Sequence, residues 1–211
     1  MSEGIKAIIF DYGNVLCEPQ PDADVQAMAD AVSMSLATFK SAYWRWRVTY
    51  DRAEVEPRDY WNQLAGRELS ADELRRLWDL DNRSWLHPRQ AMLGPAARAK
   101  EIGLRTALLS NLPVTLRDAL EDGSAKWLPK FDVNTYSCSI GVTKPDAAIY
   151  EQCVADLGMK PDQVAFLDDR PENVKGANEL GIQAVQFETA EQALGELQSR
   201  FGISLRVPPL L

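Results

Sequence analysis

The stretch IKAIIFDYGN (residues 5–14) decides the fold of this 211-residue chain. Six largely apolar residues lead directly into Asp11, and a short polar turn that contains Gly13 follows. Short runs rich in Ile and Phe are typical of strands that are buried on both faces of a parallel sheet. We therefore expect a buried strand here, with a carboxylate at its carboxyl end.

Four similar apolar runs follow, and segments of helical periodicity separate them. This alternation is typical of βαβ units. The predicted strands are Lys6–Phe10, Arg105–Leu109, Val133–Tyr136, Val164–Leu167 and Ala184–Phe187. The predicted helices between and after them are Gln90–Ile102, Val114–Leu120, Asp146–Leu157, Glu172–Leu180 and Ala190–Arg200. The predicted fold class is α/β, with a doubly wound, Rossmann-like parallel sheet of five strands.

The first two predicted strands are separated by far more residues than one crossover helix needs. This span favours several helices, with Pro57 in a first turn and Ser70 as an N-cap. We predict an inserted α-helical cap domain at residues 18–87, and a core domain formed by residues 1–17 and 88–211.

An aromatic and basic stretch, AYWRWR (residues 42–47), lies within the predicted insertion. Tyr43, Trp46 and Tyr50 follow each other at helical spacing, which predicts one packing face of the insertion. In a second interpretation, Arg45 or Arg47 extends into the crevice and contacts the substrate.

The net charge and the cysteines limit the classes of function that the sequence allows. The chain has 23 Lys and Arg against 31 Asp and Glu, a net charge of −8, which disfavours binding to nucleic acid and to anionic lipid surfaces. Cys17, Cys138 and Cys153 are odd in number and lack metal-ligand spacing, as in reduced cytosolic proteins. The sequence shows neither a signal peptide nor an apolar stretch of about 18 residues. We expect a cytoplasmic monomer or homodimer that binds neither nucleic acid nor membranes.

Polar residues follow four of the predicted strands, where ligands bind in open parallel sheets. They are Asp11 after the first strand, Ser110 and Asn111 after the second, Lys144 after the third, and Asp168 and Asp169 after the fourth. Each one alone is an ordinary turn former, helix cap or solvated side chain. Two adjacent carboxylates repel each other unless a cation or a shared proton intervenes, so the set predicts a nucleophile beside a Mg²⁺ site.

These residues, in this order, resemble the four motifs of the haloacid dehalogenase superfamily of hydrolases. The motifs are carried by Ile8–Asp11, Leu108–Asn111, Lys144–Asp146 and Phe166–Asp169. The position of the insertion resembles that of the small helical cap in the first subfamily. Gly-Asn-Val at residues 13–15 resembles the group that includes sugar-1-phosphate phosphatases.

The resemblance implies a Mg²⁺-dependent phosphatase that acts on a small phosphorylated metabolite through an aspartyl-phosphate. Asp11 would be the nucleophile, assisted by Lys144, and Ser110, Asn111 and Lys144 would bind the phosphoryl group. The metal ligands would be Asp11, the backbone carbonyl of Gly13 and Asp169, with Asp168 sharing the ion or orienting its waters.

One position departs from the family pattern. Family phosphatases usually carry a second aspartate, the general acid, where this chain has Gly13, and such catalysis is typically worth about 10²–10⁴-fold in rate. His87 is one candidate to replace it, but we favour the interpretation of His87 as a helix-start residue before Pro88. Two other functions stay open: a metal-free 2-haloacid dehalogenase, whose family pattern lacks the Asp168-Asp169 pair, and a non-catalytic protein that binds a phosphorylated ligand.

Overall fold

The computed structural model describes residues 4–123 and 125–206. Its sheet has five parallel strands in the order β3-β2-β1-β4-β5. The strands are β1 (Ala7–Phe10), β2 (Arg105–Ser110), β3 (Val133–Tyr136), β4 (Val164–Asp168) and β5 (Gln183–Gln186). Each predicted strand is confirmed to within one residue at either end. The first strand is central, so Asp11 lies in the middle of the sheet edge.

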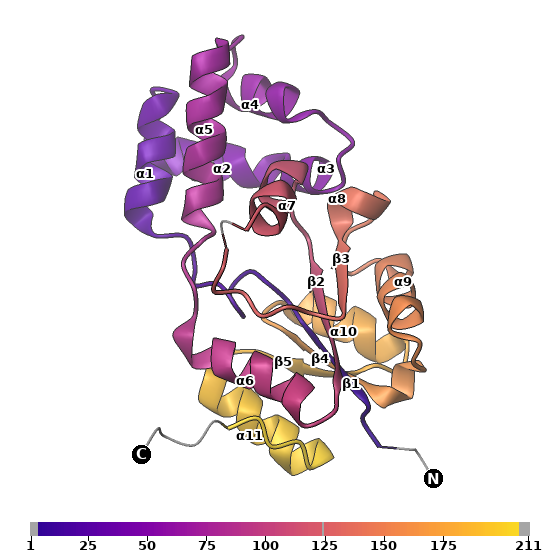
Figure 1. Ribbon diagram of the computed structural model, residues 1–211. Coiled ribbons are helices and arrows are strands. Elements are labelled where there is room, and N and C mark those ends of the chain that lie inside the picture. The colour runs from indigo at the N-terminus through magenta and orange to yellow at the C-terminus, as the bar shows by residue number, and fades with distance from the viewer. Residues whose placement is uncertain (1–3, 124, 207–211) are drawn as a thin grey trace.

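Helices cover both faces of the sheet, which confirms the doubly wound arrangement (Figure 1). The core helices are α6 (Gln90–Glu101), α7 (Val114–Glu121), α8 (Ser137–Ile140), α9 (Ala147–Leu157), the 3₁₀ turn η1 (Pro161–Gln163), α10 (Pro171–Glu179) and α11 (Ala190–Phe201). Ile8 and Phe10 belong to the apolar cluster that includes residues of α6 and α11. Ile9 belongs to the cluster that includes residues of α9 and α10. Alternate side chains of β1 thus enter two cores, which explains its unbroken apolar sequence.

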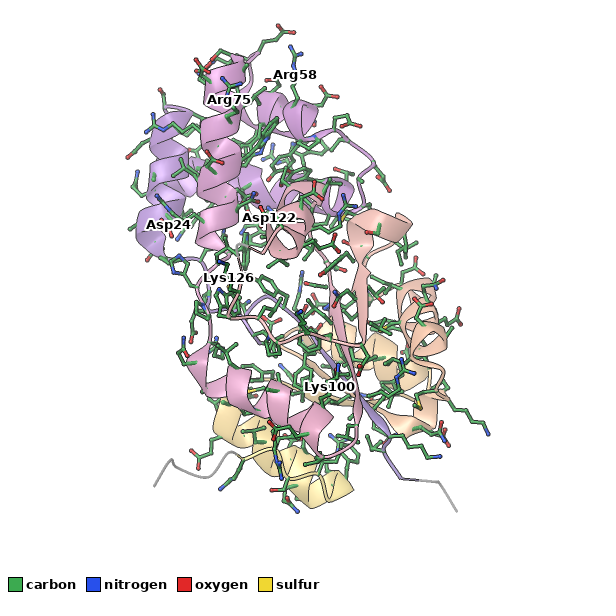
Figure 2. The ribbon with its side chains drawn as sticks, in the orientation of Figure 1. Asp24, Arg58, Arg75, Lys100, Asp122 and Lys126 are labelled. Atoms are coloured by element: carbon green, nitrogen blue, oxygen red, sulfur yellow. The ribbon has the colours of Figure 1, made fainter. Side chains whose placement is uncertain are left out.

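The long segment between β1 and α6 forms five helices, which we call the helical insertion. They are α1 (Asp22–Ala31), α2 (Leu36–Arg45), α3 (Arg47–Asp51), α4 (Pro57–Ala65) and α5 (Ala71–Ser84). Pro57 begins α4, and Ser70 caps α5 in a capping box with Glu73, as predicted. The insertion has its own apolar cluster, and charged side chains such as Arg58 and Arg75 extend outward from it (Figure 2).

The sequence predicted that Tyr43, Trp46 and Tyr50 share one packing face, and this prediction is wrong for Trp46. The helix breaks at Trp46, which lies between α2 and α3, so the helical spacing does not continue through it. Tyr43 and Tyr50 are buried, and the Tyr50 ring stacks on Tyr60 with centroids 4.2 Å apart. Trp46 is instead 38% exposed.

No helix in the described part of the chain has the length and apolar character needed to cross a membrane.

Candidate active site

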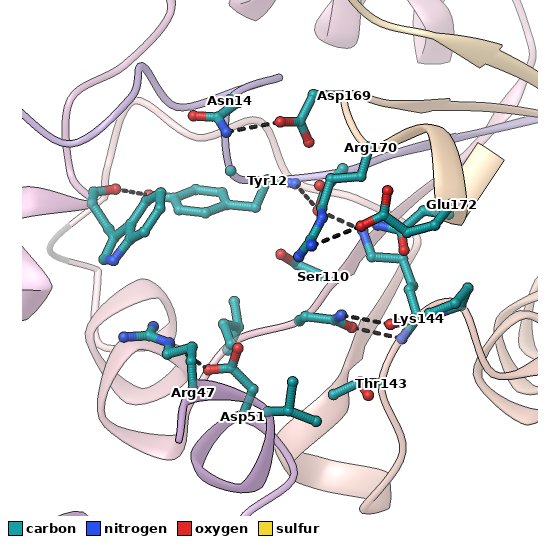
Figure 3. Close-up of a pocket in the computed structure, with 18 of the residues that line it drawn as sticks. Tyr12, Asn14, Arg47, Asp51, Ser110, Thr143, Lys144, Asp169, Arg170 and Glu172 are labelled. Carbon is teal, nitrogen blue, oxygen red and sulfur yellow. Dashed lines mark hydrogen bonds and ion pairs between the residues drawn. The ribbon is translucent and has the colours of Figure 1, made fainter. Parts of the chain in front are cut away.

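The carboxyl ends of the strands and the helical insertion enclose a cavity of about 420 Å³ (Figure 3). Asp11, Ser110, Asn111, Lys144 and Asp169 all line it, and so does Gly13. The strand-end residues that the sequence singled out are therefore brought together, and all but one of them line the cavity. Asp168 lies just behind the cavity wall and has no exposed surface.

Lys144 is buried and its ammonium group lies between two carboxylates. The Nζ atom is 2.7 Å from Asp11 Oδ1 and 2.6 Å from Asp168 Oδ2, and it donates to the carbonyl of Leu109 at 3.0 Å. Asn111 fixes the lysine backbone, because its Oδ1 accepts from Lys144 N (2.8 Å) and its Nδ2 donates to Lys144 O (3.0 Å). Asn111 thus positions Lys144 and also lines the cavity.

Burial raises the pKa of Asp11 to about 7, although Lys144 acts in the opposite direction and Asp168 adds to the rise. Burial alone would lower the pKa of Lys144, but the facing carboxylates Asp11 and Asp168 outweigh it and raise that pKa. The lysine is therefore a cation at neutral pH. A further positive charge beside Asp11 would favour its ionised form, which is the nucleophilic one.

Asp11, Asp168 and Asp169 each offer a carboxylate oxygen, and these atoms lie within 4.8 Å of one another. Such hard oxygen donors suit Mg²⁺, so the residues fit the ion that the sequence predicts. Their surroundings differ, however. Asp168 accepts hydrogen bonds from Asn173 Nδ2 (2.9 and 3.1 Å) and from Arg170 N (2.9 Å) in addition to Lys144. Its oxygens are already occupied, which favours a positioning role.

Asp169, unlike Asp168, lines the cavity. Its Oδ2 accepts a hydrogen bond from Asn14 Nδ2 at 2.8 Å. Asn14 has a left-handed backbone conformation with φ of 57°, which Asn tolerates better than most residues. Burial raises the pKa of Asp169, with Asn14 acting in the opposite direction. The side chains of Asn14 and Asn173 were not predicted as site residues, although both lie within five positions of a predicted one.

The backbone of Gly13 does not have a positive φ. A Cβ at this position would lie 3.5 Å from Cζ3 of Trp85, an ordinary contact distance. The Trp85 indole thus lies beside the position where family phosphatases carry their acid. Its Nε1 donates to the hydroxyl of Tyr43 at 3.1 Å, and its carbonyl accepts from the hydroxyl of Tyr12 at 2.6 Å.

His87 does not line the cavity. Its Nε2 pairs with Asp24 Oδ2 at 2.8 Å. It does not begin a helix either, because α6 begins at Gln90; the carbonyl of His87 instead accepts from Glu18 N at 2.7 Å. Both interpretations of His87 are therefore wrong, and the structure does not bring it to the site.

Of the two arginines proposed to extend into the crevice, Arg47 lines the cavity and Arg45 does not. Arg47 is buried, and its Nε donates to Asp51 Oδ1 at 2.8 Å, while its Nη1 donates to the Tyr43 hydroxyl and lies 3.4 Å from Asp81. Burial raises the pKa of Asp51 to about 6, against the opposing effect of Arg47. The i,i+4 spacing of Arg47 and Asp51 was the one sequence signal for this pair.

Three consecutive residues attach the insertion to the core. The hydroxyl of Tyr50 lies 3.0 Å from that of Thr115, Ser137 Oγ donates to the Asp51 carbonyl at 2.6 Å, and Arg52 Nε donates to Thr143 at 3.0 Å. These contacts reach α7, α8 and the loop before Lys144. They hold α3 as the wall of the cavity opposite the sheet.

Comparisons with known proteins agree on one family. Residues 5–181 match the haloacid dehalogenase-like hydrolases. The chain is 27% identical over 207 residues to a D-ribitol-5-phosphate phosphatase of Bacteroides thetaiotaomicron, covering 92% of this chain and 97% of that protein. It is 25% identical over 203 residues to a sesquiterpene phosphatase of Aspergillus oryzae, covering 96% and 100%. The matches to five other curated relatives span only 10% to 30% of the length of those proteins.

Solved structures show the same fold. A family enzyme of Bacteroides thetaiotaomicron, in complex with magnesium and inorganic phosphate, superposes with a TM-score of 0.68 at 18% identity, covering 88% of this chain and 95% of that one. An L-2-haloacid dehalogenase, PA0810, superposes with a TM-score of 0.65 at 22% identity, covering 87% and 85%. The family match over most of the chain, the parallel sheet and the strand-end residues agree with one another. The chain belongs to the haloacid dehalogenase-like hydrolase family.

Proposed function

We propose that this chain is a Mg²⁺-dependent phosphatase that hydrolyses a small phosphorylated metabolite through an aspartyl-phosphate on Asp11. The observation that carries the proposal is the contact of the Lys144 ammonium with Asp11, in a cavity that Ser110 and Asp169 also line. A carboxylate approaching an anionic phosphate meets strong repulsion, and a fixed cation at contact distance reduces it.

In the proposed reaction, a carboxylate oxygen of Asp11 attacks phosphorus and the bond to the leaving alcohol breaks. As Asp11 binds phosphorus, Lys144 shifts its hydrogen bond from Asp11 to a phosphoryl oxygen, and the hydroxyl of Ser110 donates to another, so that the group is held in line. Since residue 13 has no side chain, the leaving oxygen takes its proton from water. Water then attacks phosphorus, the bond to Asp11 breaks, and inorganic phosphate leaves with the carboxylate regenerated.

Asp11, Asp169 and the backbone carbonyl of Gly13 would hold the Mg²⁺ ion, with Asp168 behind them. When bound, the ion would supply positive charge to the phosphoryl oxygens and to Asp11. The magnesium and phosphate named for the Bacteroides structure, and the two full-length phosphatase relatives, support this assignment. In the same proposal, residues 18–87 act as a cap over a core of residues 1–17 and 88–211. A cytoplasmic location and a monomeric or homodimeric state stay predictions of the sequence.

A 2-haloacid dehalogenase is the second candidate, because a dehalogenase shares the fold. Asp169 beside Asp11 favours the phosphatase, since attack on carbon needs no metal and gains nothing from a second carboxylate. A non-catalytic protein that binds a phosphorylated ligand is the third candidate. Hydrolysis of 4-nitrophenyl phosphate and release of chloride from 2-chloropropionate, each measured with Mg²⁺ and with excess EDTA, separate the three. We expect phosphate release that needs Mg²⁺, and no chloride release.

The control for this assay is the exposed Asp118→Asn variant, which changes one carboxylate outside the cavity. Full phosphatase activity in EDTA, or chloride release, would contradict the proposed function. Phosphate binding without turnover would favour the non-catalytic alternative.

A further inference from the structure

The cavity lining combines two kinds of side chain. Asp11, Ser110, Lys144 and Asp169 line it at the strand ends. Five apolar side chains, which we call the apolar wall, also line it: Trp44, Val48, Trp85, Leu112 and Leu116. The organic part of a phosphate ester held at the strand ends is therefore within reach of apolar side chains.

The two tryptophans come from different ends of the insertion and meet at the cavity. Trp44 is in α2 and Trp85 follows α5, and their rings lie edge to face with centroids 6.4 Å apart. Trp44 is 51% exposed, so its indole is available to a ligand. Trp85 also lies next to Gly13. The aromatic wall therefore begins close to the nucleophile, where the first atoms beyond the phosphate would lie.

Four charged side chains of the cavity lining, two from the insertion and two from the segment after β4, form two ion pairs. Arg47 binds Asp51 at 2.8 Å, and Arg170 binds Glu172 at 2.7 Å. A polyol in this space would have to compete with these ion pairs for its hydrogen bonds. An aromatic group would instead gain apolar burial and favourable ring contacts.

We infer that the natural substrate carries its phosphate on an aromatic leaving group, so that an aryl phosphate is the preferred class. The inference rests on the proposed phosphatase function and specifies its substrate. Gly13 supports it independently, because a phenolate carries negative charge well enough to leave without a general acid, whereas an alkoxide does not. The apolar wall and the lack of an acid at residue 13 thus both favour an aryl phosphate.

The test compares kcat/KM for phenyl phosphate, 2-naphthyl phosphate and ribitol 5-phosphate. The two phenols have nearly equal acidity, so a difference between their esters reports the apolar wall and not the chemical step. Burial of the second ring predicts a preference of about tenfold for 2-naphthyl over phenyl phosphate. Both should exceed ribitol 5-phosphate.

Trp44→Ala should remove most of that preference, and Trp44→Phe should restore part of it. Trp46→Ala is the matched control, because Trp46 is exposed two residues away and does not line the cavity. Equal rates for the two aryl esters, a preference for ribitol 5-phosphate, or the same loss in Trp46→Ala would overturn the inference.

Calorimetric binding of the two aryl phosphates to Asp11→Asn protein in the presence of Mg²⁺ separates this inference from the proposed function. Tighter binding of the naphthyl ester without turnover by the wild type would retain the aromatic site and reject the phosphatase. Turnover of phosphate esters without an aryl preference would retain the phosphatase and reject the aromatic site.

Discussion

The Nζ atom of Lys144 lies 2.6 Å from Oδ2 of Asp168, a carboxylate with no exposed surface. A buried ion pair of this kind is costly to break on one side, because the remaining charge stays desolvated. Asp168→Asn should therefore lower the free energy of unfolding by about 3 kcal/mol and reduce kcat by at least about tenfold. Urea unfolding and steady-state kinetics measure the two effects. The Mg²⁺ concentration for half-maximal rate should change little; a large rise with unchanged stability would make Asp168 a metal ligand.

Asp169→Ala should change the metal requirement and not the stability, the opposite of what we expect for Asp168→Asn. Asp169 faces the cavity and burial raises its pKa, so its removal should relieve repulsion with Asp168 and leave stability unchanged or slightly higher. The Mg²⁺ concentration for half-maximal rate should rise by more than about tenfold. Asn14→Gly, which removes the hydrogen bond to Asp169 and tolerates the left-handed backbone at residue 14, should cause a smaller rise. Metal titrations of activity measure both. An unchanged metal requirement in Asp169→Ala would mean that another carboxylate holds the ion.

Gly13→Asp should restore a general acid without loss of the fold. The backbone at residue 13 has no positive φ, and a Cβ would meet Trp85 at 3.5 Å. In the wild type, the rate should fall steeply as the pKa of the leaving alcohol rises, and in the variant this dependence should flatten. Single-turnover rates for a series of aryl and alkyl phosphates measure the slope, and a melting curve serves as the control. A shallow slope in the wild-type burst would indicate a general acid elsewhere in the site.

The buried carboxyl of Asp51 should make stability depend on pH. Burial raises its pKa from 3.8 to about 6, so the folded protein holds this proton more tightly than the unfolded chain does. Its contribution to the free energy of unfolding should therefore fall as the pH rises from about 4 to about 6, by at most about 3 kcal/mol, and stay constant above. The difference in unfolding free energy between wild type and Asp51→Asn should show this fall. The control is Asp59→Asn, which removes an exposed carboxyl from the same insertion. A flat difference for Asp51→Asn would contradict the account.

The strands and the strand-end residues were accessible to sequence analysis because both follow from local rules. A parallel strand buried on two faces is uniformly apolar, and its carboxyl end places Asp11, Ser110 and Lys144 at one edge. Trp85 beside Gly13 and the break at Trp46 depend instead on how the insertion packs against itself and the core. Those contacts join residues far apart in the chain, and no periodicity encodes them.

The proposed function depends most directly on a covalent bond between Asp11 and phosphorus. With Gly13 in place of the group that would activate water, release of the phosphoryl group should be slow and the intermediate should accumulate. Rapid acid quench of the protein with a ³²P-labelled aryl phosphate and Mg²⁺, followed by peptide mapping, tests this claim. The account predicts label on the peptide that contains Asp11, and none in Asp11→Asn or in EDTA. Rapid Mg²⁺-dependent turnover with label on a different residue, or undiminished turnover in Asp11→Asn, would contradict it.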